Sequence, residues 1–178
     1  MFEVILIIAI VLAVAIAVIL ILAATKPNEF RIERSATINA PAETIFAVLS
    51  DFHQWTHWSP WEHRDPNLKR SFDGAERGKG AIYGWEGNKN VGSGRMEILE
   101  ANAPSKLRIK LDFFTPFEAH NSAEFTLLPQ GSATNVHWLM RGPAPFMSKL
   151  MQVFMNFDKM IGKDFETGLA SLKAHTEK

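Results

Sequence analysis

Hydrophobic positions are distributed unevenly along the chain, and one stretch near the N-terminus contains nothing else. Val4 to Ala24 include no charged or hydrogen-bonding side chain, no glycine and no proline. At ~1.5 Å per residue, a helix of this length reaches ~31 Å, which matches the hydrocarbon thickness of a bilayer. The pattern predicts one transmembrane helix within residues 1–25, followed by a single domain at residues 26–178.

A cleavable signal peptide is the main alternative for this stretch. Such a peptide has a basic start, an apolar core of roughly 7–15 residues and small residues at its cleavage site. Here the only charged side chain before the stretch is Glu3, and the apolar run is longer. A buried helix of a soluble protein is a third alternative, although helices that are apolar on every face are rare outside membranes. We therefore expect a permanent single-pass anchor, whose featureless interior argues against a pore or a transporter.

The charges that flank the apolar stretch predict its orientation. Lys26, Arg31 and Arg34 follow it, whereas no lysine or arginine precedes it. Because positive residues beside a membrane span tend to stay in the cytoplasm, we expect the domain to lie on the cytoplasmic side of the membrane.

The domain opens with a strand and then a helix. Between Phe30 and Asn39, apolar and polar residues alternate, which is typical of a half-buried strand. Pro41 and Glu43 suit the first turn of a helix, since that turn leaves its amides unpaired and its positive end favours an acidic side chain. Asp51 to Pro66 contain three tryptophans and two prolines, so we expect a short helix or turns there rather than a strand.

Beyond Leu68 the pattern changes to alternating segments separated by turns rich in glycine and proline. We expect six antiparallel strands between Leu68 and Arg141. Phe146 to about Ala174 carry apolar residues at helical spacing, which predicts one long amphipathic helix. The order of strand, one or two short helices, six strands and long helix indicates an α+β fold, in which a curved antiparallel sheet wraps the C-terminal helix.

Two further features lie on this long helix. Met147, Met151 and Met155 form a stripe that points ~100° away from the core face of the helix. We expect the tryptophan-rich segment to cover this stripe; an exposed stripe would favour contact with lipid or a partner. Asp164 falls on the core face, where it could pair with Arg34 or line a pocket, and we expect it near a helix end in solvent.

Composition argues against several classes of function. The 19 basic and 19 acidic residues give a net charge of 0, so no basic excess indicates a nucleic-acid binder. The absence of cysteine excludes disulfides, thiol catalysis and cysteine-based zinc sites. His53, His57 and His63 have near-helical spacing, but Pro60 interrupts them and the sequence has no His-Glu-x-x-His signature. We expect neither a metal site nor a cofactor.

Four stretches carry a resemblance to a known superfamily. They are RIERSATINAPAETIFAVLSDFHQWTHWSPW, GKGAIYGWEGN, VGSGRMEI and MNFDKMIGKDFETGLASLK. Together with the order of elements, they resemble the SRPBCC (START-like, helix-grip) superfamily, which includes START lipid-transfer domains, pollen-allergen-like proteins and polyketide cyclases. The chain looks like the membrane-tethered, polyketide cyclase/dehydrase-like branch. The resemblance implies a helix-grip fold with an apolar cavity between the sheet and the long helix, but a fold name that contains "cyclase" does not imply cyclisation.

Inward strand positions and the apolar face of the helix would line such a cavity. Apolar walls with one or two convergent polar groups, here Asn121 and Arg34, describe a small-molecule site. Without the resemblance, the same pattern would describe an ordinary packed core. The residues that we expect to contact a ligand are Arg34, Tyr83, Trp85, Phe113, Asn121, Trp138, Met140, Phe154 and Phe157.

Three functional hypotheses follow from the anchor and the resemblance. The first is a membrane-tethered domain that binds a hydrophobic small molecule, such as a lipid, an isoprenoid or a polyketide-like compound. The second is a cyclase or dehydratase that acts on such a ligand, which would need a polar group with a perturbed pKa inside the pocket. The third is a non-enzymatic module that regulates a membrane partner. The sequence nominates no catalytic residue, so whether any reaction is catalysed stays open.

Overall fold

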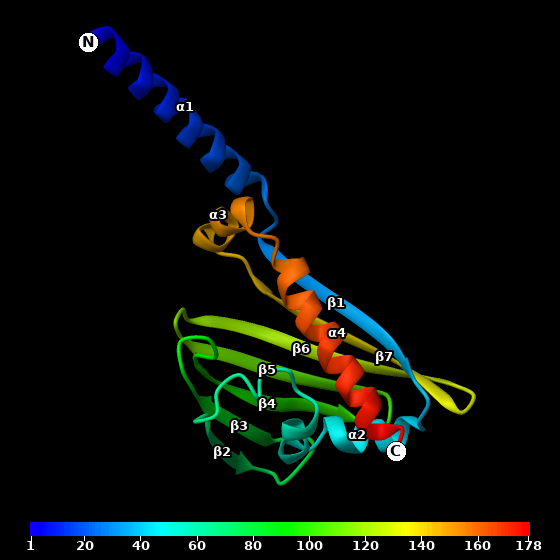
Figure 1. Cartoon of the computed structure of the whole chain (residues 1–178). Helices are drawn as coiled ribbons and strands as arrows, with labels where there is room; N and C mark the ends of the chain where they lie inside the picture. Colours follow the sequence, from blue (N-terminus) through cyan, green and yellow to red (C-terminus); the bar gives the residue numbers. More distant parts are fainter.

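The computed structural model describes residues 1–178, and Figure 1 shows a long helix projecting from an α+β domain. In this domain a seven-stranded antiparallel sheet curves around the C-terminal helix, as the sequence pattern predicts. The elements are α1 (Phe2–Thr25), β1 (Glu29–Ile38), α2 (Ala42–Leu49), the 3-10 helix η1 (Phe52–His57), β2 (Lys69–Gly74), β3 (Ala81–Glu86), β4 (Ser93–Asn102), β5 (Lys106–Thr115), β6 (Ala119–Gln130), β7 (Ala133–Pro143), α3 (Phe146–Phe154) and α4 (Phe157–Thr176).

The projecting helix α1 is long and apolar enough to cross a membrane, and a signal sequence would meet the same criterion. Most of its side chains are exposed, and only Ala23, close to its C-terminal end, is buried. The helix therefore contributes no core to the domain, and an apolar environment other than the domain would have to surround it.

The first and last strands of the domain pair with each other at one edge of the sheet. Its order is β1-β7-β6-β5-β4-β3-β2, so β1 pairs with β7 although residues 39–132 of the chain lie between them. In this pair Ile32 lies opposite Met140, and Ala36 lies opposite Val136. Ile32 is buried and its neighbour Glu33 is exposed, which confirms the half-buried strand predicted from alternation.

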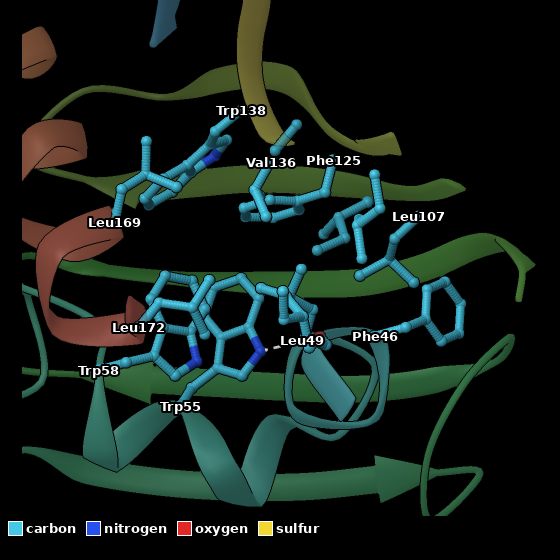
Figure 2. Packing of buried hydrophobic residues seen from close by; sticks show 14 of the residues in the cluster. Phe46, Leu49, Trp55, Trp58, Leu107, Phe125, Val136, Trp138, Leu169 and Leu172 are labelled. Carbon is cyan, nitrogen blue, oxygen red and sulfur yellow. Dashed lines mark hydrogen bonds between the residues drawn. The ribbon is translucent and has the colours of Figure 1, made fainter. Parts of the chain in front are cut away.

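Aromatic side chains occupy much of the space between the sheet and the C-terminal helix (Figure 2). Trp55 and Trp58 come from the tryptophan-rich segment and reach under the sheet, where the Trp58 and Trp138 ring centroids are 5.5 Å apart. Trp138 stacks on Phe165 of α4 with a centroid separation of 4.0 Å and an interplanar angle of 3°. The Trp55 indole donates a hydrogen bond of 3.0 Å to the carbonyl of Leu49, which ties η1 to the end of α2.

The C-terminal helix is not continuous, contrary to the sequence-based prediction. It divides into α3 and α4 at Met155, whose backbone is extended (φ −126°, ψ 135°). Asn156 then caps α4, because its side chain accepts a 2.9 Å hydrogen bond from the amide of Lys159. Asparagine competes with the helical backbone through such bonds, and a 3.6-residue period alone does not reveal the interruption.

The break redirects α3 away from the core, so the expected covering of the methionine stripe is wrong. Met147 is 64% exposed, and Met151 and Met155 are also exposed. The tryptophan-rich segment packs instead beneath the sheet and α4, and α3 lies beside the end of α1 (Figure 1).

A charged clamp attaches α4 to β1. The Arg34 guanidinium donates from Nε to Glu166 Oε1 at 2.8 Å, from Nη1 to Asp158 Oδ1 at 3.0 Å and from Nη2 to the Asp158 carbonyl at 3.0 Å. These bonds lower the pKa of the Asp158 carboxyl. The guanidinium lies directly over Gly162, where any Cβ would collide with it. Arg34 is therefore committed to holding the helix against the strand.

A glycine on α4 provides a test of the close packing between helix and sheet. A Cβ on Gly168 would lie 2.9 Å from Trp138 Cζ3 and 3.1 Å from Pro60 Cδ. We expect Gly168→Ala to lower the free energy of unfolding by about 1–3 kcal/mol through overpacking, although alanine is favoured over glycine in an open helix by about 1 kcal/mol. Urea unfolding followed by tryptophan fluorescence measures the change. Thr167→Ala, on the exposed side of the same turn, is the control, and an unchanged or raised midpoint for Gly168→Ala would contradict the contact.

Candidate functional site

A cavity of about 190 Å³ lies between the sheet, the tryptophan-rich segment and α4. Fourteen of its 17 lining residues are hydrophobic, so its walls resemble those of a small-molecule pocket more than a polar active site. Strands β3 to β7 supply one wall, and Trp61 and Phe165 belong to the other. The cavity is therefore a gap that the core side chains leave unfilled, at the position implied by the helix-grip arrangement.

One end of the cavity carries a buried polar group. Glu62 is 5% exposed and Tyr83 is 3% exposed, and the Tyr83 hydroxyl donates a 2.6 Å hydrogen bond to Glu62 Oε1. Arg70 donates from Nε to Glu62 Oε2 at 2.7 Å and from Nη2 to the Glu62 carbonyl at 3.1 Å. Both carboxylate oxygens thus have a donor, which is the condition for keeping a charge in such a place.

The surroundings of this group keep Tyr83 neutral. Burial raises the pKa of the Tyr83 hydroxyl well above its ordinary value of 10.0, and its hydrogen bond to Glu62 raises it further. The hydrogen bond to Glu62 also raises the pKa of the Arg70 guanidinium. The result is a fixed array in which the Glu62 carboxylate and the Tyr83 phenol line the apolar cavity and the Arg70 guanidinium holds the carboxylate.

The cavity has two other polar lining residues, Ser59 and Asp164. Asp164 pairs with Arg64 of the tryptophan-rich segment rather than with Arg34. It is half-buried, well inside α4 and not in solvent near a helix end, so that expectation is wrong. The ion pair joins the two elements that form the helical wall of the cavity.

Five of the residues predicted from the sequence meet at the cavity. They share inward positions on the strands, and they are Tyr83, Trp85, Phe113, Trp138 and Met140. Trp85 and Phe113 are half-buried and pack edge to face with a centroid separation of 5.6 Å. The alternation of the strands was sufficient to bring these five side chains together.

The other four predicted residues lie elsewhere. Arg34 binds the acidic side chains of α4, and Phe157 packs against the core beside the cavity. Phe154 is 70% exposed on α3, because the break at Met155 turns it outward. Asn121 is half-buried close to Gly142, and its buried Oδ1 has no hydrogen-bond partner.

Among the cavity residues that the sequence-based list of ligand contacts did not include, Glu62, Trp55 and Trp61 come from the tryptophan-rich segment. They belong to an irregular segment, where no periodicity indicates which side chains point inward. A signal was present, since an acidic residue directly follows the third of three closely spaced tryptophans, Trp61. Its burial depends on Arg70 and Tyr83, which come from the neighbouring strands β2 and β3.

The three histidines of this segment do not converge. His53 stacks on Phe72 with a centroid separation of 4.1 Å and pairs with Asp51. His57 stacks on His175, near the C-terminal end of α4, at 5.1 Å. The chain has no cluster of three or more histidine, aspartate or glutamate side chains that could hold a metal ion.

Comparison with known proteins gives one family match and many structural matches. The sequence model of the family described as "Polyketide cyclase / dehydrase and lipid transport" matches residues 29–177. No curated protein matches the chain at the sequence level.

Three solved structures illustrate the likeness of fold. A protein of unknown function from Staphylococcus aureus, SA2116, has a TM-score of 0.62 at 10% identity, with 84% of this chain and 93% of that chain covered. Ginseng major latex-like protein 151 from Panax ginseng has a TM-score of 0.60 at 10% identity, with 85% and 100% covered. The Aha1 protein from Colwellia psychrerythraea, solved as a dimer, has a TM-score of 0.60 at 15% identity, with 83% and 96% covered. At these identities the likeness extends to the fold alone.

The single tyrosine of the chain allows a direct test of the polar group. Tyr83 is the only tyrosine, so tyrosinate absorbance reports on this residue alone. We expect little tyrosinate as the folded protein passes pH 10.0, the ordinary pKa. Because the folded-state pKa is raised, the stability that Tyr83 contributes is complete below the unfolded-state pKa and is lost as the pH rises through the folded-state value.

A spectrophotometric pH titration checks this expectation, with the urea-unfolded chain as the control that should titrate at the ordinary pKa. Glu62→Gln removes a neighbouring charge but not the burial, so its folded form should titrate between the control and the wild type. A folded wild-type protein that titrated together with the unfolded control would contradict the arrangement.

Proposed function

Because the chain belongs to the polyketide cyclase/dehydrase and lipid transport family, we propose that it is a membrane-anchored domain that binds a hydrophobic small molecule between the sheet and α4. The observation that supports this most directly is the cavity of about 190 Å³ with its largely hydrophobic lining. Apolar walls with a few placed polar groups are the usual composition of a ligand pocket.

The volume of the cavity limits the part of a ligand that it can enclose. Pockets for drug-sized molecules measure roughly 300–1,000 Å³, and an apolar cavity of about 150 Å³ accommodates benzene. A cavity of about 190 Å³ therefore suits one or two fused rings or a short branched chain. A longer lipid or isoprenoid would have to leave part of its chain outside.

The polar end of the cavity suggests which functional group the ligand carries. The Tyr83 hydroxyl donates its hydrogen bond to Glu62, so toward a ligand it can only accept a hydrogen bond. Glu62 is likewise an acceptor, and Arg70 is already directed at it. A ligand with a hydroxyl donor on an apolar body matches this end better than a ligand that offers only acceptors.

The helix α1 would keep the domain at the bilayer, where apolar molecules accumulate. Tethering raises the effective concentration of a binding site at that surface without any additional contact. The side of the membrane follows only from the basic residues after α1, and we propose the cytoplasmic side on that ground.

An enzyme is the second candidate, and buried Glu62 is the observation that favours it. A carboxylate beside a ligand is a potential general base. Both of its oxygens already accept hydrogen bonds, so it would have to give up Tyr83 or Arg70 to take a proton. Binding alone requires no such rearrangement, and we therefore prefer it. An enzyme would lose turnover but retain ligand binding in Glu62→Gln.

Filling the cavity tests the proposed binding. Ala123 lines the cavity from β6, so Ala123→Met would occupy part of its volume. We expect this variant to bind naphthol at least tenfold more weakly than the wild type, a loss of about 1.4 kcal/mol. Calorimetric titration of the full chain in nanodiscs, with empty nanodiscs as the blank, measures the affinity. Ala170→Met places the same side chain on the exposed side of α4 and should bind like the wild type. No uptake by the wild type, or equal affinities for all three proteins, would exclude the cavity as the site.

A pair of matched probes tests the polar end. Naphthol and its methyl ether have nearly the same apolar body, but only naphthol can donate a hydrogen bond. We expect the wild type to bind naphthol more tightly by about 1 kcal/mol, the usual net contribution of a buried hydrogen bond. The same titration gives both affinities, after the difference in partitioning into empty nanodiscs is subtracted. Equal affinities would indicate a ligand held by apolar contacts alone.

A further inference from the structure

The short helix α3 has its apolar residues on the outside. Phe146, Met147, Met151 and Phe154 project from one side of the helix and are between 36% and 70% exposed. Lys149, the only charged residue of α3, is instead buried. A surface helix in water normally shows the opposite arrangement, with apolar residues inward and charged residues outward. An apolar environment outside the protein would account for this inversion.

The same helix is attached to the end of α1. α3 lies against the C-terminal end of α1 (Figure 1), and Ala23, near that end, is the buried residue of α1. The Lys149 ammonium donates to the side chain of Asn28, between α1 and β1, and the amide of Ala144 donates a 2.8 Å hydrogen bond to the Asn28 carbonyl. These contacts fix the position of α3 at the level where the apolar residues of α1 end.

The topology of the sheet brings a second apolar segment to the same end of the domain. In an antiparallel sheet successive turns alternate between the two ends, so the β5–β6 turn lies at the end where β1 begins and β7 finishes. Phe114, near the end of β5, is 53% exposed, and Phe117, in the turn itself, is 72% exposed. The single charged residue of the turn, Glu118, pairs with His120 at 3.3 Å.

Several half-buried lining residues of the cavity lie at this end as well. Val91 belongs to the β3–β4 turn, and Phe113 lies near the end of β5, just before the β5–β6 turn. Ile161 lies in the first turns of α4, directly after the break that follows α3. The cavity thus approaches the surface at the end of the domain from which α1 emerges.

We propose that this apolar surface, formed by Phe114, Phe117, Phe146, Met147, Met151 and Phe154, lies in the interfacial layer of the same bilayer that α1 spans. Its α3 part lies against the apolar helix α1, and none of its six residues is charged, so a neutral lipid surface suffices. It turns the accessible end of the cavity toward the bilayer, and a hydrophobic ligand can pass between lipid and protein with little exposure to water. The proposal rests on the membrane anchoring and the cavity of the proposed function.

Site-directed labelling tests the position of the surface. The chain contains no cysteine, so each variant with one introduced cysteine carries a single nitrobenzoxadiazole fluorophore. The full chain is reconstituted in phosphatidylcholine vesicles with and without nitroxide-labelled phosphatidylcholine. For Met151→Cys and Phe117→Cys we expect a blue-shifted emission that the nitroxide lipids quench severalfold.

Two further positions make the outcome decisive. Leu128→Cys is the matched control, because Leu128 is also apolar and 54% exposed but lies near the β6–β7 turn at the opposite end of the domain. Its label should be neither shifted nor quenched. Val18→Cys lies within α1 and should be quenched strongly.

The results separate failure of this proposal from failure of the proposed function. Quenching at Val18 without quenching at Met151 and Phe117 would overturn the interfacial position, while the anchor and the cavity would stand. Absence of quenching at Val18 would remove the anchor, and with it this proposal. A blue shift at Met151 without lipid quenching would overturn the proposal in favour of a protein partner or a second copy of the chain.

Discussion

The separation between α4 and the sheet is the constraint on which the cavity depends, and Arg34 sets it at one end. Its guanidinium bonds to Asp158 and Glu166 across the space that the absent side chain of Gly162 leaves open. Further along α4, Phe165 stacks on Trp138 of β7 with ring centroids 4.0 Å apart. This second contact fixes the distance between the helix and the sheet at that point. Between these two fixed contacts the side chains do not fill the core, and the remaining volume becomes the pocket. A helix held at one point only could settle onto the sheet and close it.

Much of this arrangement could be predicted from the sequence, because it depends on local periodicity. Alternation in β1 and in the later strands gave the inward positions, and through them Tyr83, Trp138 and Met140 at the cavity. The break at Met155 could not be predicted in this way, since Met155 and Asn156 interrupt the helix through backbone conformation and a cap rather than through the hydrophobic period. The position of Phe154 was mispredicted for the same reason, because the apolar face of one continuous helix was assumed to extend over both α3 and α4.

Glu62 illustrates a second limit of prediction from sequence. Its burial depends on Tyr83 from β3 and Arg70 from β2, and these partners meet it only once the sheet has formed. A cluster formed by residues distant in the sequence leaves no local pattern. From the sequence alone, an acidic residue in a tryptophan-rich turn is expected to be exposed to solvent. With Ser59 and Asp164, Glu62 makes up the polar part of the cavity lining, so periodicity alone misses a polar group that a ligand would meet.

The break between α3 and α4 at Met155 and Asn156 also affects how a force applied to α1 would reach the rest of the domain. A pull on α1 reaches the domain through Asn28, which bonds to Ala144 and Lys149, and through the first residues of β1. Both routes load the β1–β7 pair and α3, and the extended backbone at Met155 interrupts a direct helical path into α4. The load on β1 then reaches α4 through Arg34, which bonds to Asp158 and Glu166. A pull on α1 would therefore act on the pocket through the strand pair and this ion-pair cluster, and not along one continuous helix.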